Sequence, residues 1–232
     1  LAVMISTIPA VSEANESKNR KALKGAGENS LKLSAMLAFP AGIGIFVLAE
    51  PIMTLIYQNN NQGYSYLALF GICLPFLILG QALSSILQGM GKVMIPVLCI
   101  IGAAIFKLAV NYYLIPTKLE GKGALVGSII YCFVFFLLNY VILTRRSNIK
   151  LSLRIFIKPL LAAVIMGVFS VLTYQLARMI FDISISTLLA VIGGGLVYGI
   201  VVIVLKIFTV EELEDLPKGK KIVWLLRKIK VL

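Results

Sequence analysis

The sequence predicts an all-α, polytopic helical membrane protein, and three observations lead to this prediction. Of the 232 residues, 59% are hydrophobic and 14% are charged, which is more apolar surface than one soluble core of this length can bury. The mean hydropathy is +0.97. Apolar runs of about 20 residues, the length that crosses a bilayer as a helix, recur between short polar connectors. These features exclude an ordinary soluble enzyme.

Six apolar segments are long enough to cross the membrane, and a truncated helix precedes them. Gly- or Pro-containing polar connectors separate the segments. We predict spans at residues 33–57, 64–89, 93–116, 123–143, 159–177 and 186–208. The apolar opening is different, because twelve residues rise only about 18 Å as a helix and a bilayer core is about 30 Å thick. We therefore interpret residues 1–14 as the end of a truncated transmembrane helix.

Two polar segments flank the spans. Residues 15–32 are basic and have some helical periodicity, so we predict a cytoplasmic amphipathic connector there. Residues 209–232 open with a capping-box pattern, Thr209 followed by Glu212. Apolar residues at helical spacing and six cations follow Pro217. We predict that this basic amphipathic tail lies on an anionic cytoplasmic leaflet.

The cations are distributed unevenly between the two predicted sides of the membrane. The net charge is +12. When alternate connectors are assigned to alternate sides, eighteen of the 22 Lys and Arg residues fall on one side. Lys118, Lys122 and Arg178 fall on the other side, and Lys107 lies within a span. Because cytoplasmic loops carry an excess of Lys and Arg, we predict a multi-pass membrane protein with a cytoplasmic C-terminus. The charge indicates contact with anionic lipids and not with nucleic acid.

The sequence holds no histidine, and its three cysteines lie far apart. Without an imidazole, the Ser-His-Asp triad, the Cys-His dyad and the His-containing zinc sites are excluded. Cys73, Cys99 and Cys132 lie in apolar runs without CxxC spacing, so we interpret them as small buried hydrophobic residues. We predict that the protein is not an enzyme and has no catalytic residue, metal or cofactor.

Lys107 and Asn111 are polar residues one helical turn apart inside a predicted span. A charge at this depth costs about 2.5–3.5 kcal/mol on the insertion scale. One interpretation is that both residues line a central cavity, where Lys107 binds an anionic headgroup or phosphate. The other is that the Lys107 side chain extends past Asn111 to the outer membrane surface. The sequence leaves both interpretations open.

A polar stripe lies in the preceding predicted span. Gln81, Ser84, Ser85 and Gln88 recur at i, i+3, i+4 and i+7, a spacing that places them on one helix face. Such a stripe is unfavourable against lipid, so it either forms interhelical hydrogen bonds or lines a translocation path. Glu50, near the outer end of its span, is a further candidate for binding a coupling ion, with interfacial exposure as the alternative.

Small residues at i, i+4 predict close helix packing. Gly123 and Gly127 form one GxxxG pattern, and Gly195 and Gly199 form another. In membranes, this pattern lets two helices approach closely. Asn139, near the cytoplasmic end of its span, is also predicted to have a packing role.

Short motifs in a fixed order resemble those of the multidrug/oligosaccharidyl-lipid/polysaccharide exporter superfamily. The motifs are STIPAVSEA at residues 6–14, FPAG at 39–42, LAEPI at 48–52, SILQGMGK at 85–92, and Lys107 with Asn111 before LIP at 114–116. Together they are most similar to the stage V sporulation protein B and polysaccharide-biosynthesis branch. The resemblance runs over nearly the whole chain.

The resemblance implies the second lobe of a fourteen-helix, alternating-access transporter. Residues 33–143 would form the transmembrane helices of the C-lobe. Residues 159–208 would form two additional C-terminal helices, which in the lipid II flippases are associated with a groove for the lipid tail. The implied location is the bacterial cell membrane, and the implied partners are a lipid-linked glycan and the N-terminal lobe of the same protein. The implied activity is flipping or export of an undecaprenyl-linked oligosaccharide or peptidoglycan precursor for cell-wall, polysaccharide or spore-cortex synthesis.

Three other functions compete with this one. A cation-coupled multidrug exporter of the same superfamily would be supported by a carboxylate deep in the spans, where only Glu50, near a span end, is available. A polytopic membrane glycosyltransferase needs convergent carboxylates or a metal site beside the membrane. A structural scaffold would affect cell morphology without moving lipid.

We expect that this chain, expressed alone, does not transport, because the first lobe and half of the cavity are missing from it. The test is expression in a bacterium depleted of its own flippase, where growth should not be restored. Restored growth would contradict this prediction.

Overall fold

The structure is a computed structural model that describes residues 2–57, 63–116, 120–147, 154–205 and 207. Its described elements are all α-helices. They are α1 (Ala2–Glu16), α2 (Arg20–Val47), α3 (Ala49–Tyr57), α4 (Tyr64–Gly89), α5 (Met94–Leu114), α6 (Glu120–Ser147), α7 (Arg154–Arg178) and α8 (Ile183–Val204). Six of them, α2 and α4 to α8, are long and apolar enough to cross a membrane. The predicted fold class, a polytopic helical membrane protein, is confirmed.

The predicted connector and the predicted first span share one helix. The Asn19 side chain caps the start of α2 by accepting hydrogen bonds from the backbone N–H groups of Lys21 and Ala22, both at 3.1 Å. Lys24 and Glu28 pair one turn further on, at 3.7 Å. The 28 residues of α2 rise about 42 Å, so the first turns of α2 extend beyond a hydrocarbon core of about 30 Å.

The segment predicted as one span at residues 33–57 is divided at Leu48. Helix α2 ends at Val47 and α3 begins at Ala49. Pro51 explains the break, because its ring nitrogen has no hydrogen to donate to the Val47 carbonyl and its ring collides with that group in a continuous helix. The short helix α3 then carries Glu50 in its first turn.

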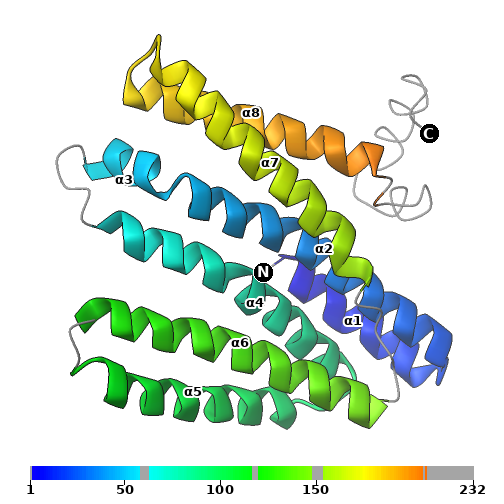
Figure 1. The fold of residues 1–232 in the computed structure, drawn as a ribbon. Coiled ribbons are helices and arrows are strands. Elements are labelled where there is room, and N and C mark those ends of the chain that lie inside the picture. The colour runs from blue at the N-terminus through cyan, green and yellow to red at the C-terminus, as the bar shows by residue number, and fades with distance from the viewer. Residues whose placement is uncertain (1, 58–62, 117–119, 148–153, 206, 208–232) are drawn as a thin grey trace.

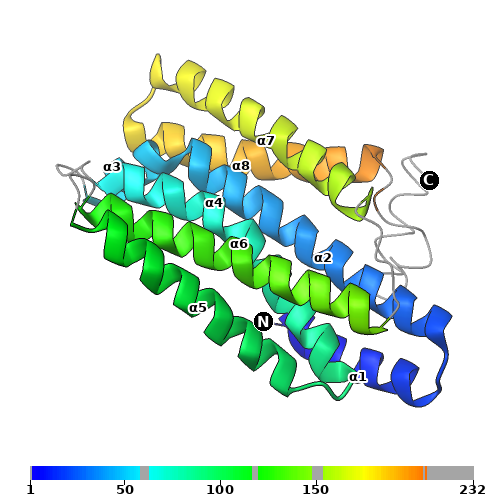
Figure 2. The same ribbon diagram turned by 60° about the horizontal axis from the view of Figure 1, so that its bottom comes forward.

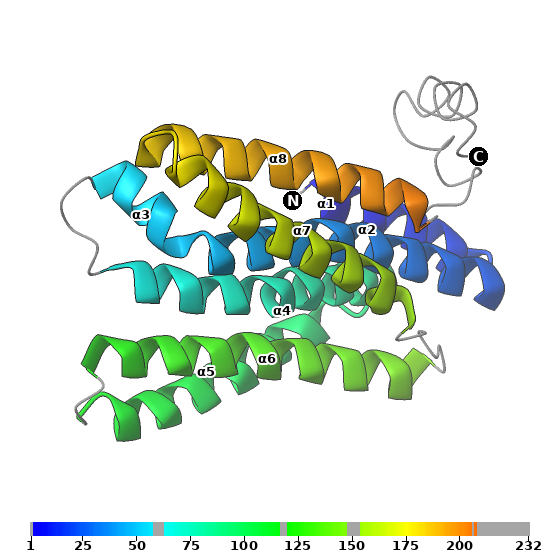
Figure 3. The same cartoon turned by 45° about the horizontal axis from the view of Figure 1, so that its top comes forward.

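The helices form a row in which α4 and α2 are central (Figure 1). Helix α4 packs against α1, α2 and α6, while α5 packs mainly against α6. Helices α7 and α8 pack against each other, and α7 also packs against α2. Figures 2 and 3 keep α5 and α6 on one side of this row and α7 and α8 on the other.

Glycines on opposite sides of α4 allow its neighbours to approach closely. A Cβ added at Gly71 would lie 2.7 Å from the Gly42 carbonyl oxygen of α2, and one at Gly89 would lie 2.8 Å from the Ile8 carbonyl oxygen of α1. A Cβ at Gly80 would instead meet the Phe135 ring of α6 at 2.7 Å. Gly71 and Gly89 are 18 residues apart, which is five helical turns, so they lie on the same face of α4. Gly80 is nine residues from each of them, which is two and a half turns, so it lies on the opposite face. Helix α4 is therefore packed between α1 and α2 on one face and α6 on the other.

The helix ends that border the predicted basic connectors lie together at one end of the bundle. The C-terminal ends of α1, α4, α6 and α8 are at this end, and the α7–α8 turn, the end of α5 and the start of α6 are at the opposite end (Figure 1). Lys18, Lys92 and Arg145 are described at the first end, and Lys122 and Arg178 at the second. The described helices therefore alternate in direction, as was assumed when the cations were assigned to the two sides of the membrane.

The packing predicts that Gly42→Ala destabilises the protein and that Gly44→Ala does not. A Cβ at Gly42 would lie 2.7 Å from the Pro75 ring and 2.8 Å from the Gly71 carbonyl oxygen, whereas a Cβ at Gly44 would meet only the Met166 methyl at 3.6 Å. We expect Gly42→Ala to lower the free energy of unfolding by about 1–3 kcal/mol, measured by denaturant titration in mixed micelles. Equal stability of the two variants would contradict the close α2–α4 approach.

Candidate functional site

The polar stripe of α4 divides between two environments. Ser84 is buried and faces α6, where its hydroxyl lies 3.2 Å from Asn139 Oδ1 and 3.0 Å from the Gly80 carbonyl oxygen of its own helix. Asn139 is fully buried and donates from Nδ2 to the Phe135 carbonyl at 2.8 Å. This buried contact joins α4 to α6. Both polar atoms of the Asn139 side chain, Oδ1 and Nδ2, have a hydrogen-bond partner.

The other members of the stripe do not reach α6 in this way. Ser85 is buried and donates to the Gln81 carbonyl one turn earlier, at 3.1 Å. Gln81 is exposed and Gln88 is half-buried. Gln81 is therefore the most exposed member of the stripe and is accessible to a ligand or to another part of the protein.

Lys107 and Asn111 lie on the face of α5 that packs against α6. The Lys107 ammonium is 5.9 Å from the centroid of the Tyr131 ring, within the range of a cation–π interaction. Asn111 Oδ1 is buried against Gly127, whose missing side chain leaves room for it, and has no hydrogen-bond partner among the described residues. Both side chains are half-buried, so the pair is at the edge of the α5–α6 contact.

The two helices run antiparallel through this contact. Lys107 is beside Tyr131, Asn111 beside Gly127, and Leu114 beside Gly123, where a Cβ would meet the Leu114 backbone at 3.0 Å. Gly123 and Gly127 therefore lie where α5 approaches α6. In contrast, a Cβ at Gly195 or Gly199 would meet nothing within 4 Å. The structure thus places one predicted GxxxG pair at a helix contact and leaves the other facing open space.

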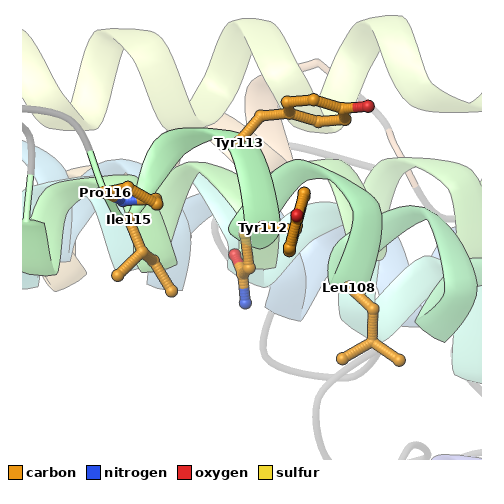
Figure 4. A pocket seen from close by; sticks show the side chains of 6 residues that line it. Leu108, Tyr112, Tyr113, Ile115 and Pro116 are labelled. Carbon is orange, nitrogen blue, oxygen red and sulfur yellow. The ribbon is translucent and has the colours of Figure 1, made fainter.

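A shallow hollow of about 770 Å³ adjoins Asn111 (Figure 4). Leu108, Tyr112, Tyr113, Ile115 and Pro116 line it with Asn111. All six residues come from the end of α5 and the two positions that follow it. The hollow is therefore a feature of one helix end and not an enclosed cavity between helices.

A more enclosed apolar cavity of about 230 Å³ lies where four helices meet. Helices α2, α3, α7 and α8 contribute to its lining, which includes Pro40, Ile52, Met166, Ser170 and Val191. Sequence reasoning did not identify these residues as a group. They are apolar or small residues in four separate segments, with no shared spacing or charge to indicate that they meet.

The remaining predicted residues are placed separately. Glu50 is exposed in α3, at the end of the bundle away from the basic connectors (Figure 1). The cysteines Cys73, Cys99 and Cys132 are free and buried, as the sequence predicts. In the part of the chain that the structure describes, no three His, Cys, Asp or Glu side chains gather in a way that could hold a metal ion. The predicted basic tail at residues 209–232 lies outside the described residues.

A known family matches the first half of the chain. The MatE family model covers residues 1–113, which correspond to α1 to α5 without its last residue. The resemblance that the motifs indicate, to the multidrug/oligosaccharidyl-lipid/polysaccharide exporter superfamily, is thereby confirmed. The chain is a multi-pass membrane protein similar to the flippase branch of that superfamily.

Individual relatives extend the similarity beyond residue 113. The "uncharacterized membrane protein YabM" of Bacillus subtilis strain 168 is 27% identical over 98% of this chain and 44% of its own length. The "lipid II flippase MurJ" of the same strain is 25% identical over 84% of this chain and 38% of its own length. The "probable lipid II flippase MurJ" of Bdellovibrio bacteriovorus is 22% identical over 72% and 33%. The chain spans less than half the length of each of these relatives.

The α4–α6 contact predicts different effects for two adjacent serines. Ser84→Ala removes the hydroxyl that bonds to Asn139, and such contacts between membrane helices contribute about 0.6 kcal/mol on average and about 1.7 at most. We expect Ser84→Ala to lower the free energy of unfolding in mixed micelles by an amount in this range. Ser85→Ala, which removes only a bond within α4, is the control and should change it by less than about 0.5 kcal/mol. A larger loss for Ser85→Ala would contradict this assignment.

Proposed function

We propose that this chain is part of a flippase that moves a lipid-linked oligosaccharide or peptidoglycan precursor, carried on undecaprenyl, across the cytoplasmic membrane. One observation carries the proposal. The MatE model ends at residue 113, but similarity to the Bacillus subtilis flippase covers 84% of the chain and must therefore continue into the later helices. The similarity is thus not limited to the segment common to the wider exporter family.

The charge distribution supports one orientation. The described helix ends that border the cation-rich connectors are at one end of the bundle (Figure 1), and cytoplasmic loops carry such an excess of Lys and Arg. In the proposed topology the C-terminus and the start of α2 are cytoplasmic. The cations at this end would contact anionic lipids, and residues 209–232 are the proposed principal contact.

The proposed polar site is built around α4 and α5. Lys107 has no carboxylate partner among the described side chains, and its ammonium lies beside the Tyr131 ring instead. A lysine held over an aromatic ring keeps its net positive charge, which is available to an anionic phosphate or headgroup. Asn111, with its unsatisfied oxygen, and Gln81, with its exposed amide, would add polar contacts. In this proposal Ser84 positions α4 against α6 and does not touch the cargo.

The proposed apolar site is the cavity between α2, α3, α7 and α8. Its lining is almost entirely hydrocarbon, and helices α7 and α8 correspond to the two additional helices that the family resemblance associates with a groove for the lipid tail. The cavity is suited to part of a polyprenyl chain, which gains free energy of roughly 25 cal/mol per Å² of apolar surface removed from water.

A multidrug exporter of the same superfamily is less well supported. Its cation-coupled chemistry calls for a carboxylate within the spans, and Glu50 is exposed at a helix end instead. The relatives with a stated activity are named as flippases and not as enzymes, which also disfavours a glycosyltransferase.

The test is lipid translocation by the full-length parent protein in vesicles. We expect Lys107→Ala to reduce translocation of a fluorescent undecaprenyl-linked precursor by at least about 10-fold, equivalent to about 1.4 kcal/mol, because its charge is removed from the cargo path. The matched control is Lys122→Ala, which removes an exposed lysine near the start of α6. Equal transport by wild type and Lys107→Ala would show that Lys107 has no role in the path. If the wild type did not translocate the precursor, the alternative function of a multidrug exporter would be favoured.

A further inference from the structure

Pro40 leaves one backbone acceptor of α2 without its usual partner. In an α-helix the N–H of each residue donates to the carbonyl four residues earlier, and proline has no N–H. Pro40 lies inside α2, so the Met36 carbonyl receives no hydrogen bond from position 40. Within a membrane, a carbonyl freed in this way is costly unless a neighbouring helix supplies a donor.

The donor comes from α8. The Tyr198 hydroxyl lies 2.7 Å from the Met36 carbonyl oxygen, although the two residues are 162 positions apart in the chain. The Tyr198 ring packs against a buried cluster that includes Ala162 of α7 and Val202 of α8, and Met36 packs against the same cluster. Tyr198 therefore replaces the donor that Pro40 removes from α2, and it does so across the α2–α8 contact.

This hydrogen bond lies at one end of the apolar cavity. Helix α8 ends at the end of the bundle where α2 begins (Figure 1), so the two helices are antiparallel. Val191, Gly195 and Tyr198 share one face of α8, at i, i+4 and i+7. Val191 and Gly195 line the cavity, as Pro40 does on α2. The next turn of each helix holds Tyr198 and Met36, so this pair limits the cavity towards the basic end of the bundle.

Between its contacts, α8 leaves the cavity open at the side. A Cβ at Gly195 would meet nothing within 4 Å, and both Gly195 and Ala41 of α2, which line the cavity, are exposed. Helix α8 also packs against α3, which follows α2 at the other end of the bundle. The position of α8 over the cavity therefore depends on the contact with α3 and on the Tyr198 hydrogen bond.

We propose that Tyr198 is a positioning residue of the apolar cavity. By supplying the donor that Pro40 lacks, its hydroxyl holds α8 on α2 and sets the width of the opening beside Gly195. The width of this opening determines how closely the cavity encloses an apolar chain, and contact with such a chain stabilises its binding. Only the identity of the chain, the polyprenyl tail of the cargo, rests on the proposed function.

The first test observes the Met36 carbonyl directly. The full-length parent protein is labelled with methionine that carries carbon-13 at its carbonyl, and infrared spectroscopy identifies the Met36 amide band by its absence in Met36→Leu. We expect Tyr198→Phe to shift this band to higher frequency, because the carbonyl loses its donor. The same variant should lower the equilibrium constant for folding in mixed micelles by about 3- to 18-fold, the range for hydrogen bonds between membrane helices.

Pro40→Ala provides the rescue. Alanine at position 40 restores an N–H that donates to the Met36 carbonyl within α2, so the carbonyl stays bonded when the Tyr198 hydroxyl is removed. In the Pro40→Ala background we expect Tyr198→Phe to leave the band in place and to change the folding constant by less than about twofold. The control is Tyr57→Phe, which removes an exposed hydroxyl from α3 and should change neither quantity.

The second test measures occupation of the cavity in vesicles. The probe is undecaprenyl phosphate with a diazirine at the end of its tail, and photolabelled α2 and α8 peptides are quantified by mass spectrometry. We expect Tyr198→Phe to reduce labelling at least about threefold, as the loss of one interhelical hydrogen bond implies. Gly195→Leu fills the opening and leaves the Tyr198 hydroxyl in place, so it should reduce labelling without moving the Met36 band.

Three outcomes would overturn the proposal. These are an unshifted Met36 band in Tyr198→Phe, an equal loss of stability with and without Pro40, and unchanged photolabelling in Tyr198→Phe. Equal photolabelling of the wild type and Gly195→Leu would instead overturn the tail site of the proposed function, while the band and the stability comparison still decide the role of Tyr198. The band shift decides the result even where Pro40→Ala fails to fold.

Discussion

Close packing around α4 is the constraint on which the rest of the structure depends. Lipid tails are as apolar as leucine, so helices in a bilayer associate through van der Waals contact and hydrogen bonds. Gly71 and Gly89 bring α2 and α1 to one face of α4, and Gly80 brings α6 to the opposite face. Helices α5 and α7 then join through α6 and α2. Without these three close contacts, the α5–α6 pair and the α7–α8 pair would not be held to the same central helices.

The sequence predicts the spans well because length and hydropathy are local properties. The predicted limits of residues 64–89 are those of α4, and the fold class is confirmed by six membrane-length helices. The helix boundaries around α2 were harder to predict. Asn19 extends α2 by capping its start, and Pro51 interrupts the predicted span. Hydropathy alone does not distinguish a capped helix from a polar connector or detect a missing backbone donor.

The polar residues show a second limit of sequence reasoning. Spacing places Lys107 and Asn111 on one face of α5, as the structure does, but it does not reveal that the face lies against Tyr131 and Gly127 of α6. Similarly, Ser84 and Ser85 are neighbours in one stripe, yet only Ser84 reaches Asn139. Which helix lies opposite a residue is a property of the tertiary fold, so the partner of each polar group could not be predicted from the sequence.

The two candidate sites are on different sides of the central helices, and this separation fits an amphipathic cargo. Polar groups gather along α4, α5 and α6, whereas the apolar cavity lies between α2, α3, α7 and α8. A lipid-linked glycan has a charged pyrophosphate and sugar at one end and a hydrocarbon chain at the other. Transporting such a molecule requires that the headgroup be shielded from hydrocarbon while the tail stays within it, because an unpaired charge in the bilayer is costly. Under the proposed function, the α4–α2 contact is the structural element between the two sites, so the packing that supports the bundle also sets the distance between headgroup and tail.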